Sequence, residues 1–279
     1  MLRRLFFQRI NAQLVIGISF LFLSLAVQSA DYVAIQGNTF SSVLSGSASK
    51  DRANVRDFYM RRAPVTNAEF LAFVQNNPEW QRDKIPAIFA ERSYLQAWTN
   101  VEDIGSGLQG ERAITNVSWF AAQAFCASEH ARLPSWYEWE LVAAADEHRA
   151  DARSDPLWRA RILSWYSAPA EATIDASTNQ TSYAPNYYGV ADMHGVIWEW
   201  VSDFNALLLS ADSRNQGDPD KLKFCGAGAI SLQNKENYAI LMRVALLSSL
   251  TGASTTANLG FRCARDVNTE TQSQNTRKK

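Results

Sequence analysis

Few side chains in this sequence are reactive by themselves, and the thiol of Cys225 is one of them. Together with His194 and either Met193 or Met242, this thiol would form a soft ligand set, which favours copper. The alternative is a small buried apolar side chain, a role that free cysteines often have. Cys225 is therefore a weak candidate for a catalytic residue.

Two short stretches combine charged and aromatic residues. Pro185–Trp200 (PNYYGVADMHGVIWEW) packs Asp192 and Glu199 around a glycine, and Asn258–Cys263 (NLGFRC) places a cysteine near the end of the chain. We expect Trp119, Trp136, Trp139, Trp198 and Trp200 in the core, because each buries a large apolar area. Arg262 is expected to serve the fold, since one guanidinium can satisfy several carbonyl groups.

The two stretches must be positioned by helices and strands, and capping signals predict where two of the helices begin. Thr66 with Glu69 and Ser135 with Glu138 form capping boxes, in which the two side chains satisfy the first helical amides. The predicted elements are strands over Asp31–Phe40 and Val55–Arg61, helices over Thr66–Asn76, Trp119–Glu129 and Ser135–Ala145, and a charged helical insertion over Asp146–Trp165. From Tyr187 to Arg265 we expect short strands joined by long turns.

Composition and charge bound the class of protein. The chain has 279 residues, of which 47% are hydrophobic, and nine tryptophans, which is enough for a substantial core. The formal net charge is −1, and no long run of basic residues is present. We therefore expect no nucleic acid as a partner.

Residues 1–30 have the layout of a secretory signal peptide, with arginines at positions 3, 4 and 9 before an apolar run, Leu14–Val27. That run is about 14 residues long, shorter than the ~20 that span a bilayer. We expect periplasmic export and no stable membrane insertion after cleavage.

In an exported chain, three cysteines suggest one disulfide and one leftover thiol. Residues 267–279 are predicted to be a disordered tail.

Five blocks, in the same order, resemble the formylglycine-generating enzyme family, also called the sulfatase-modifying factor family. They are Arg62–Val74 (RAPVTNAEFLAFV), Thr115–Cys126 (TNVSWFAAQAFC), Arg132–Leu141 (RLPSWYEWEL), Pro185–Trp200 and Arg243–Cys263. The resemblance covers residues 31–266 and implies a single compact α+β domain, related to C-type-lectin-like folds, with little regular secondary structure. Within the family, the chain resembles most the NirV-type accessory proteins found beside copper nitrite reductases.

The resemblance implies a calcium site in the loop before the WEW motif. Its ligands would be the side chain of Asp192, the backbone carbonyls of Gly195 and Ile197, and Glu199. Hard oxygen ligands from a compact loop suit Ca²⁺, and the glycine permits a tight backbone path. The alternative is structural, with Asp192 capping a turn and Glu199 making an internal salt bridge.

The cysteines both match the family and depart from it. Cys126 and Cys263 match a family disulfide, which leaves Cys225 over. The family's oxidases bind Cu(I) with two closely spaced cysteines, because soft thiolates suit that ion. The equivalent stretch here, Cys225–Tyr238 (CGAGAISLQNKENY), holds no second cysteine, so we reject formylglycine formation by that mechanism.

The resemblance predicts an exported maturation or accessory factor for a periplasmic copper or nitrite-reducing enzyme. Calcium is the expected cofactor, and copper is the less favoured one. One alternative is an oxidase that acts on a small molecule or peptide, as in pyoverdine maturation. Another is a non-catalytic binding module. Whether the chain is an enzyme stays open at this point.

Overall fold

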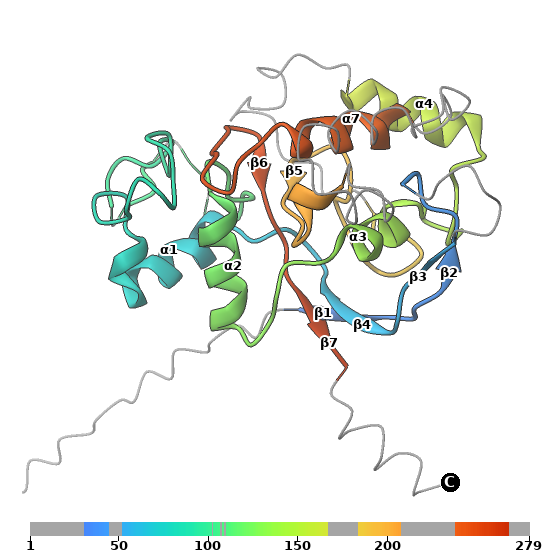
Figure 1. Ribbon diagram of the computed structural model, residues 1–279, viewed down its shortest axis with the longest axis horizontal. Helices are drawn as coiled ribbons and strands as arrows, with labels where there is room; N and C mark the ends of the chain where they lie inside the picture. Colours follow the sequence, from blue (N-terminus) through green and yellow to red (C-terminus); the bar gives the residue numbers. More distant parts are fainter. Residues whose placement is uncertain are drawn as a thin grey trace, which may run out of the picture. The chain divides into compact units, whose positions relative to one another are not determined.

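Three antiparallel strands bring the beginning and the end of the described chain together (Figure 1). The strand β1 (Tyr32–Ile35) pairs with β4 (Phe58–Arg61), and β4 pairs with β7 (Ala264–Asp266). The structure, a computed structural model, describes residues 31–44, 52–101, 103–106, 108, 110–166, 184–207 and 238–267. All of them belong to one unit that begins at residue 31.

Two smaller strand pairs complete the β structure of the described ranges. They are β2 (Thr39–Phe40) with β3 (Ala53–Asn54), which run antiparallel, and β5 (Trp198–Glu199) with β6 (Leu259–Gly260), which run parallel. Gly260 has no room for a side chain, since a Cβ there would lie 2.0 Å from the carbonyl oxygen of Ile114. Through β5 and β6, the two stretches that stand out in the sequence are direct neighbours.

Helices α1 (Asn67–Asn76) and α3 (Trp136–Ala143) begin where the two capping boxes predict. The other helices of the described ranges are α2 (Trp119–Ser128), α4 (Pro156–Tyr166) and α7 (Tyr238–Ser248), with 3₁₀ turns η1 (Pro78–Trp80) and η2 (Phe204–Ala206). Both predicted capping boxes are present, since Thr66 accepts the N–H of Glu69 and Ser135 accepts that of Glu138. Local side-chain chemistry thus determines where α1 and α3 start.

Two expectations for the second half of the chain were wrong. Helix α7 lies where only short strands and turns were expected, because its apolar run YAILMRVALLS does not distinguish a buried helix from a buried strand. The insertion Asp146–Trp165 is helical only from Pro156 onward. Its first part is a turn, in which the carboxylate of Asp146 accepts the N–H groups of His148 and Arg149.

An aromatic core lies between these elements. The rings of Phe70 and Phe125 stack 5.7 Å apart, and Phe261 meets Phe125 edge-on at 5.4 Å. Trp136, Trp139 and Trp200 are almost fully buried, as predicted, whereas Trp119 and Trp198 are only half-buried. The mixture of helices and short strands, with modest regular secondary structure, confirms the predicted α+β class. No helix in the described part has the length and apolar character needed to cross a bilayer.

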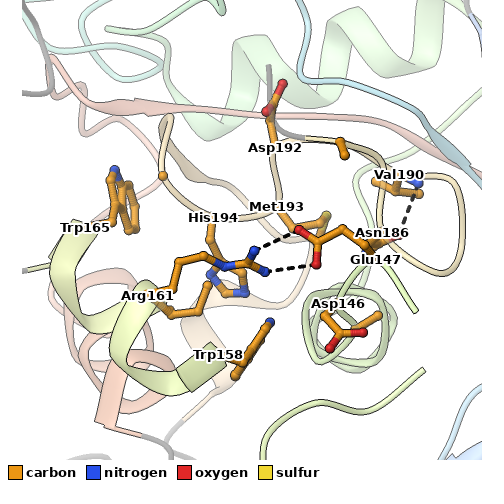
Figure 2. A pocket seen from close by; sticks show the side chains of 14 residues that line it. Asp146, Glu147, Trp158, Arg161, Trp165, Asn186, Val190, Asp192, Met193 and His194 are labelled. Carbon is orange, nitrogen blue, oxygen red and sulfur yellow. Dashed lines mark hydrogen bonds and ion pairs between the residues drawn. The ribbon is translucent and has the colours of Figure 1, made fainter. Parts of the chain in front are cut away.

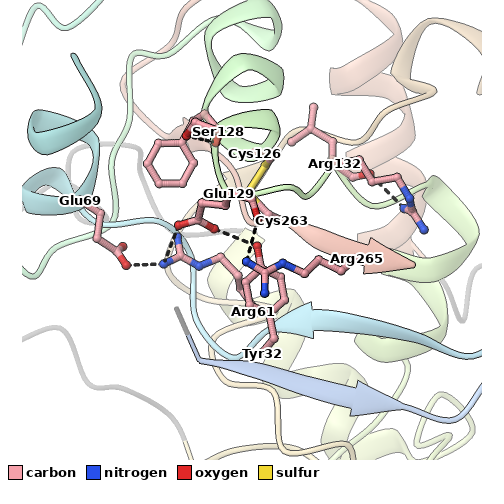
Figure 3. Close-up of a disulfide and its surroundings, with 11 residues drawn as sticks. Tyr32, Arg61, Glu69, Cys126, Ser128, Glu129, Arg132, Cys263 and Arg265 are labelled. Carbon is pink, nitrogen blue, oxygen red and sulfur yellow. Dashed lines mark hydrogen bonds and ion pairs between the residues drawn. A yellow bond between two sulfur atoms is a disulfide. The ribbon is translucent and has the colours of Figure 1, made fainter. Parts of the chain in front are cut away.

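The predicted disulfide joins Cys126 of α2 to Cys263, which directly precedes β7 (Figure 3). Both cysteines are fully buried, and their Cα atoms are 5.5 Å apart. Beside the disulfide, Arg61 of β4 pairs with Glu69 of α1, and it lies 3.7 Å from the carboxylate of Glu129. Covalent and ionic contacts therefore fasten α1 and α2 to the three-stranded sheet.

Candidate functional site

The loop that contains the predicted calcium ligands runs from Asn186 to β5 and turns tightly. The side-chain oxygen of Asn186 accepts hydrogen bonds from the N–H groups of Tyr188 and Val190. Asp192 and Gly195 have φ angles of 57° and 91°. Few non-glycine residues adopt this left-handed conformation, and aspartate does so more readily than most. The backbone therefore follows the tight path that was expected.

Glu199 lies on β5 with its carboxylate fully buried. Its Oε1 accepts from Nη2 of Arg262 at 2.7 Å, and its Oε2 accepts from the indole N–H of Trp139 at 2.9 Å. Arg262 also donates to the carbonyl oxygens of Ala191 and Asp192, at 3.1 and 3.2 Å. A buried charge pair is tolerated when such further hydrogen bonds satisfy its remaining groups. Glu199 thus forms an internal salt bridge, and Arg262 serves the fold as predicted.

Arg243 of α7 brings a second guanidinium into the same buried region. Its Cζ lies 3.7 Å from the centre of the Trp139 ring, and its Nη2 donates to the backbone oxygen of Glu199. Arginine suits this position because its flat, weakly hydrated cation can stack on an aromatic face. Arg243 is 1% exposed. The interior behind the loop therefore holds two guanidinium groups at Glu199, one on its carboxylate and one on its backbone oxygen.

These contacts test how well the loop fits the predicted calcium ion. Both oxygens of Glu199 already accept hydrogen bonds, and a cation bound to them would face the guanidinium of Arg262. The Glu199 carboxylate therefore does not fit the role of calcium ligand in this arrangement. The described residues contain no group of three or more His, Cys, Asp or Glu side chains placed to hold a metal. Calcium at Asp192, Gly195 and Ile197 stays a prediction.

His194, a member of the suggested copper set, lies beside the same interior. Its Nε2 is 2.9 Å from the carbonyl oxygen of Ala143, so Nε2 carries the proton and donates it. Burial lowers the pKa of His194 to about 4, which makes the ring neutral at neutral pH. Cys225 lies outside the described residues. A copper site that joins Cys225 to His194 is therefore untested.

A pocket beside the loop contains residues that the sequence analysis did not single out, among them Glu147, Trp158 and Arg161 (Figure 2). Arg161 donates two hydrogen bonds to Glu147, at 2.8 and 3.3 Å. The ring of Trp158 lies 5.8 Å from that of His194, at nearly a right angle. A local signal for this pocket was present, because Trp158 and Trp165 are two helical turns apart and share a face of α4.

Comparison with known proteins identifies the family. The sulfatase-modifying factor enzyme 1-like domain matches residues 23–267. The formylglycine-generating enzyme of Streptomyces coelicolor is 29% identical over 253 residues, which are 76% of this chain and 79% of that protein. The inactive C-alpha-formylglycine-generating enzyme 2 of Mus musculus is 26% identical over 254 residues and 78% of each protein.

Two further similarities are more limited. The hercynine oxygenase of Mycolicibacterium smegmatis is 28% identical over 173 residues, which are 53% of this chain and 38% of that protein. The crystal structure of CarF aligns with a TM-score of 0.46 and 18% identity, over 86% of this chain and 99% of that one. Because the domain match spans most of the sequence, this chain belongs to the sulfatase-modifying factor enzyme 1-like family.

Proposed function

We propose that this chain is an exported member of the family that lacks the two-thiolate copper centre. In this proposal it acts as a maturation or accessory factor for a periplasmic copper or nitrite-reducing enzyme. The observation that supports it most is the use of the cysteines. The sequence has three cysteines, and the disulfide uses Cys126 and Cys263, which leaves Cys225 as the third. One chain therefore cannot supply two thiolates to a single Cu(I) ion.

Two further points support a non-oxidase role outside the cytosol. A buried disulfide persists in an oxidising compartment, which agrees with export to the periplasm. The Mus musculus relative is named as inactive, so the family contains members without the reaction after which it is named. The kind of partner comes from the resemblance to NirV-type proteins, which are found beside copper nitrite reductases.

The test is deletion of the gene in its own host. We expect the copper content and the specific activity of the periplasmic partner enzyme to fall, and a plasmid with the wild-type gene to restore both. A Cys225→Ala gene should restore them equally well, because the proposal gives this thiol no oxidising role. Unchanged activity and copper content of the partner after deletion would contradict the proposal.

A second candidate is an oxidase that acts on a small molecule or peptide. The similarity to hercynine oxygenase favours it, since that relative is named as an oxygenase. It predicts about one equivalent of bound copper or another redox metal in protein purified from the periplasm, lost in Cys225→Ala. Elemental analysis of both proteins separates the candidates, because an accessory scaffold would keep the same metal content in the variant.

A further inference from the structure

Helix α7 is apolar all round, although part of it faces water. Met242 is 40% exposed and Ala245 is exposed as well, and helical spacing places both on one side together with Leu246. Arg243, the one charged residue in the sequence of this helix, points inward and is 1% exposed. A helix without a polar side is typical of one that other protein covers. The outer side of α7 is therefore apolar and open to solvent in this structure.

The apolar surface continues beyond the end of α7, along the loop 249–258 (Figure 1). In this loop Gly252 lies against Phe120 of α2, since a Cβ at the glycine would lie 2.9 Å from that ring. The ring of Phe120 meets that of Phe89 edge-on at 5.2 Å. Phe89 is 38% exposed, and its neighbour Ile88 is 73% exposed. These contacts join three segments into one surface, which we call the α7 face. It comprises residues 85–90, Trp119 and Phe120 at the start of α2, and residues 242–252.

Charged residues are missing from the segments that form the α7 face. Residues 85–90, 113–128 and 244–258 contain none, although charged residues make up 20% of the chain. The exposed side chains of Lys84, Glu91 and Arg92 flank the first of these segments. The centre of a protein–protein interface is likewise poor in charge and rich in aromatic residues and methionine, with charged residues at its rim. The composition of the α7 face is therefore that of an interface.

The absence of charge favours a second copy of this chain as the partner. An uncharged surface can lie against itself across a two-fold axis, because no like charges meet there. A charged surface of another protein would lose its water on the α7 face and find no opposite charge in return. The formal net charge of the whole chain is only −1, so two copies repel each other weakly. Interfaces between identical subunits are also more apolar than those between different proteins.

We propose that two copies of this chain form a dimer through the α7 face, with Ile88, Phe89 and Met242 buried between them. The face is smaller than a standard interface, which has about 20–30 residues per partner. We therefore expect a dissociation constant in the micromolar range. The inference does not depend on the function proposed above.

The first test is the oligomeric state of the exported, purified protein. Sedimentation velocity is measured over a series of concentrations that spans the micromolar range, and we expect a dimer that dissociates on dilution. Electrophoresis without a reducing agent verifies that Cys225 does not join two copies through a disulfide. Monomer at every concentration, or a dimer that dissociates when its disulfide is reduced, would overturn the proposal.

Substitutions that place a carboxylate on the α7 face test where the two copies meet. Met242→Glu and Ile88→Glu should each weaken dimerisation more than tenfold, because the new charge must be buried without a partner. Leu157→Glu is the matched control, since Leu157 is 82% exposed on α4 and lies outside the α7 face, and it should leave the dissociation constant unchanged. An unchanged dissociation constant in both face variants would overturn the proposal.

Urea unfolding separates this proposal from a cover provided by the chain itself. It is measured below the dissociation constant, so that only monomer is present. Both side chains face water in the monomer, so the midpoints of Met242→Glu and Ile88→Glu should stay close to that of the wild type. A large loss of stability in monomeric Met242→Glu would show that other residues of the same chain cover α7, and this result would also overturn the proposal.

Discussion

Removing Arg262 should destabilise the fold more than any change on the surface of the loop. In Arg262→Met the side chain keeps most of its volume, but the carboxylate of Glu199 loses its cation while it stays fully buried. Breaking a buried pair in this way costs about 3–5 kcal/mol. For a chain of this size, each kcal/mol lowers Tm by about 2–4 °C, so we expect a decrease of about 10 °C.

Urea unfolding of the wild type, Arg262→Met and Arg262→Met/Glu199→Leu measures this effect. The double variant also removes the unpaired, buried carboxylate of Glu199, so it should recover part of the lost free energy of unfolding. Each protein is measured in EDTA and again with added calcium. A loss below about 1 kcal/mol in the single variant would refute the reasoning. Calcium stabilisation that disappears in Glu199→Gln would instead make Glu199 a metal ligand.

Three further predictions concern stability. The double variant Cys126→Ala/Cys263→Ala should lose about 2–5 kcal/mol, because the disulfide closes a long loop; an unchanged urea midpoint would contradict this. Burial raises the pKa of Glu140, so its protonation stabilises the folded state at low pH and this contribution is lost as pH rises above the ordinary range for glutamate. Glu140→Gln should therefore flatten that part of the pH profile of unfolding, and an identical slope in both proteins would count against the assignment. Ser135→Ala removes a capping box and should lower the free energy of unfolding by about 1 kcal/mol, measured against the exposed Ser164→Ala as control.

Local signals in the sequence predicted where most helices begin. The capping boxes at Thr66 and Ser135 depend on contacts within four residues, so they can be identified without knowledge of the fold. Helix α7 was missed because even its exposed positions Met242 and Ala245 carry apolar side chains, so no polar face reveals a helical period. The turn before α4 was missed because the side chain of Asp146 bonds backbone groups that would otherwise extend a helix.

The pocket could be predicted only in part. The shared face of Trp158 and Trp165 follows from their spacing on α4, but the other lining residues lie before this helix, at 145–147, and after it, between 184 and 195. Nothing in the sequence pairs Arg161 with Glu147, because 14 residues and a turn separate them. Contacts between distant segments depend on how the elements pack, and a single sequence carries no direct record of that packing.

By itself, the sequence determined the family resemblance and the start of the capped helices, because these depend on residue identity and short spacing. The number of cysteines also determined that, once one disulfide forms, two thiolates are not left for a copper centre. Only the tertiary structure showed the salt bridge of Glu199. Its carboxylate could have been a metal ligand or half of a salt bridge, and the fold buries it against Arg262, 63 residues away in the chain. Without water, a carboxylate needs the nearest buried cation, and that position is set by packing.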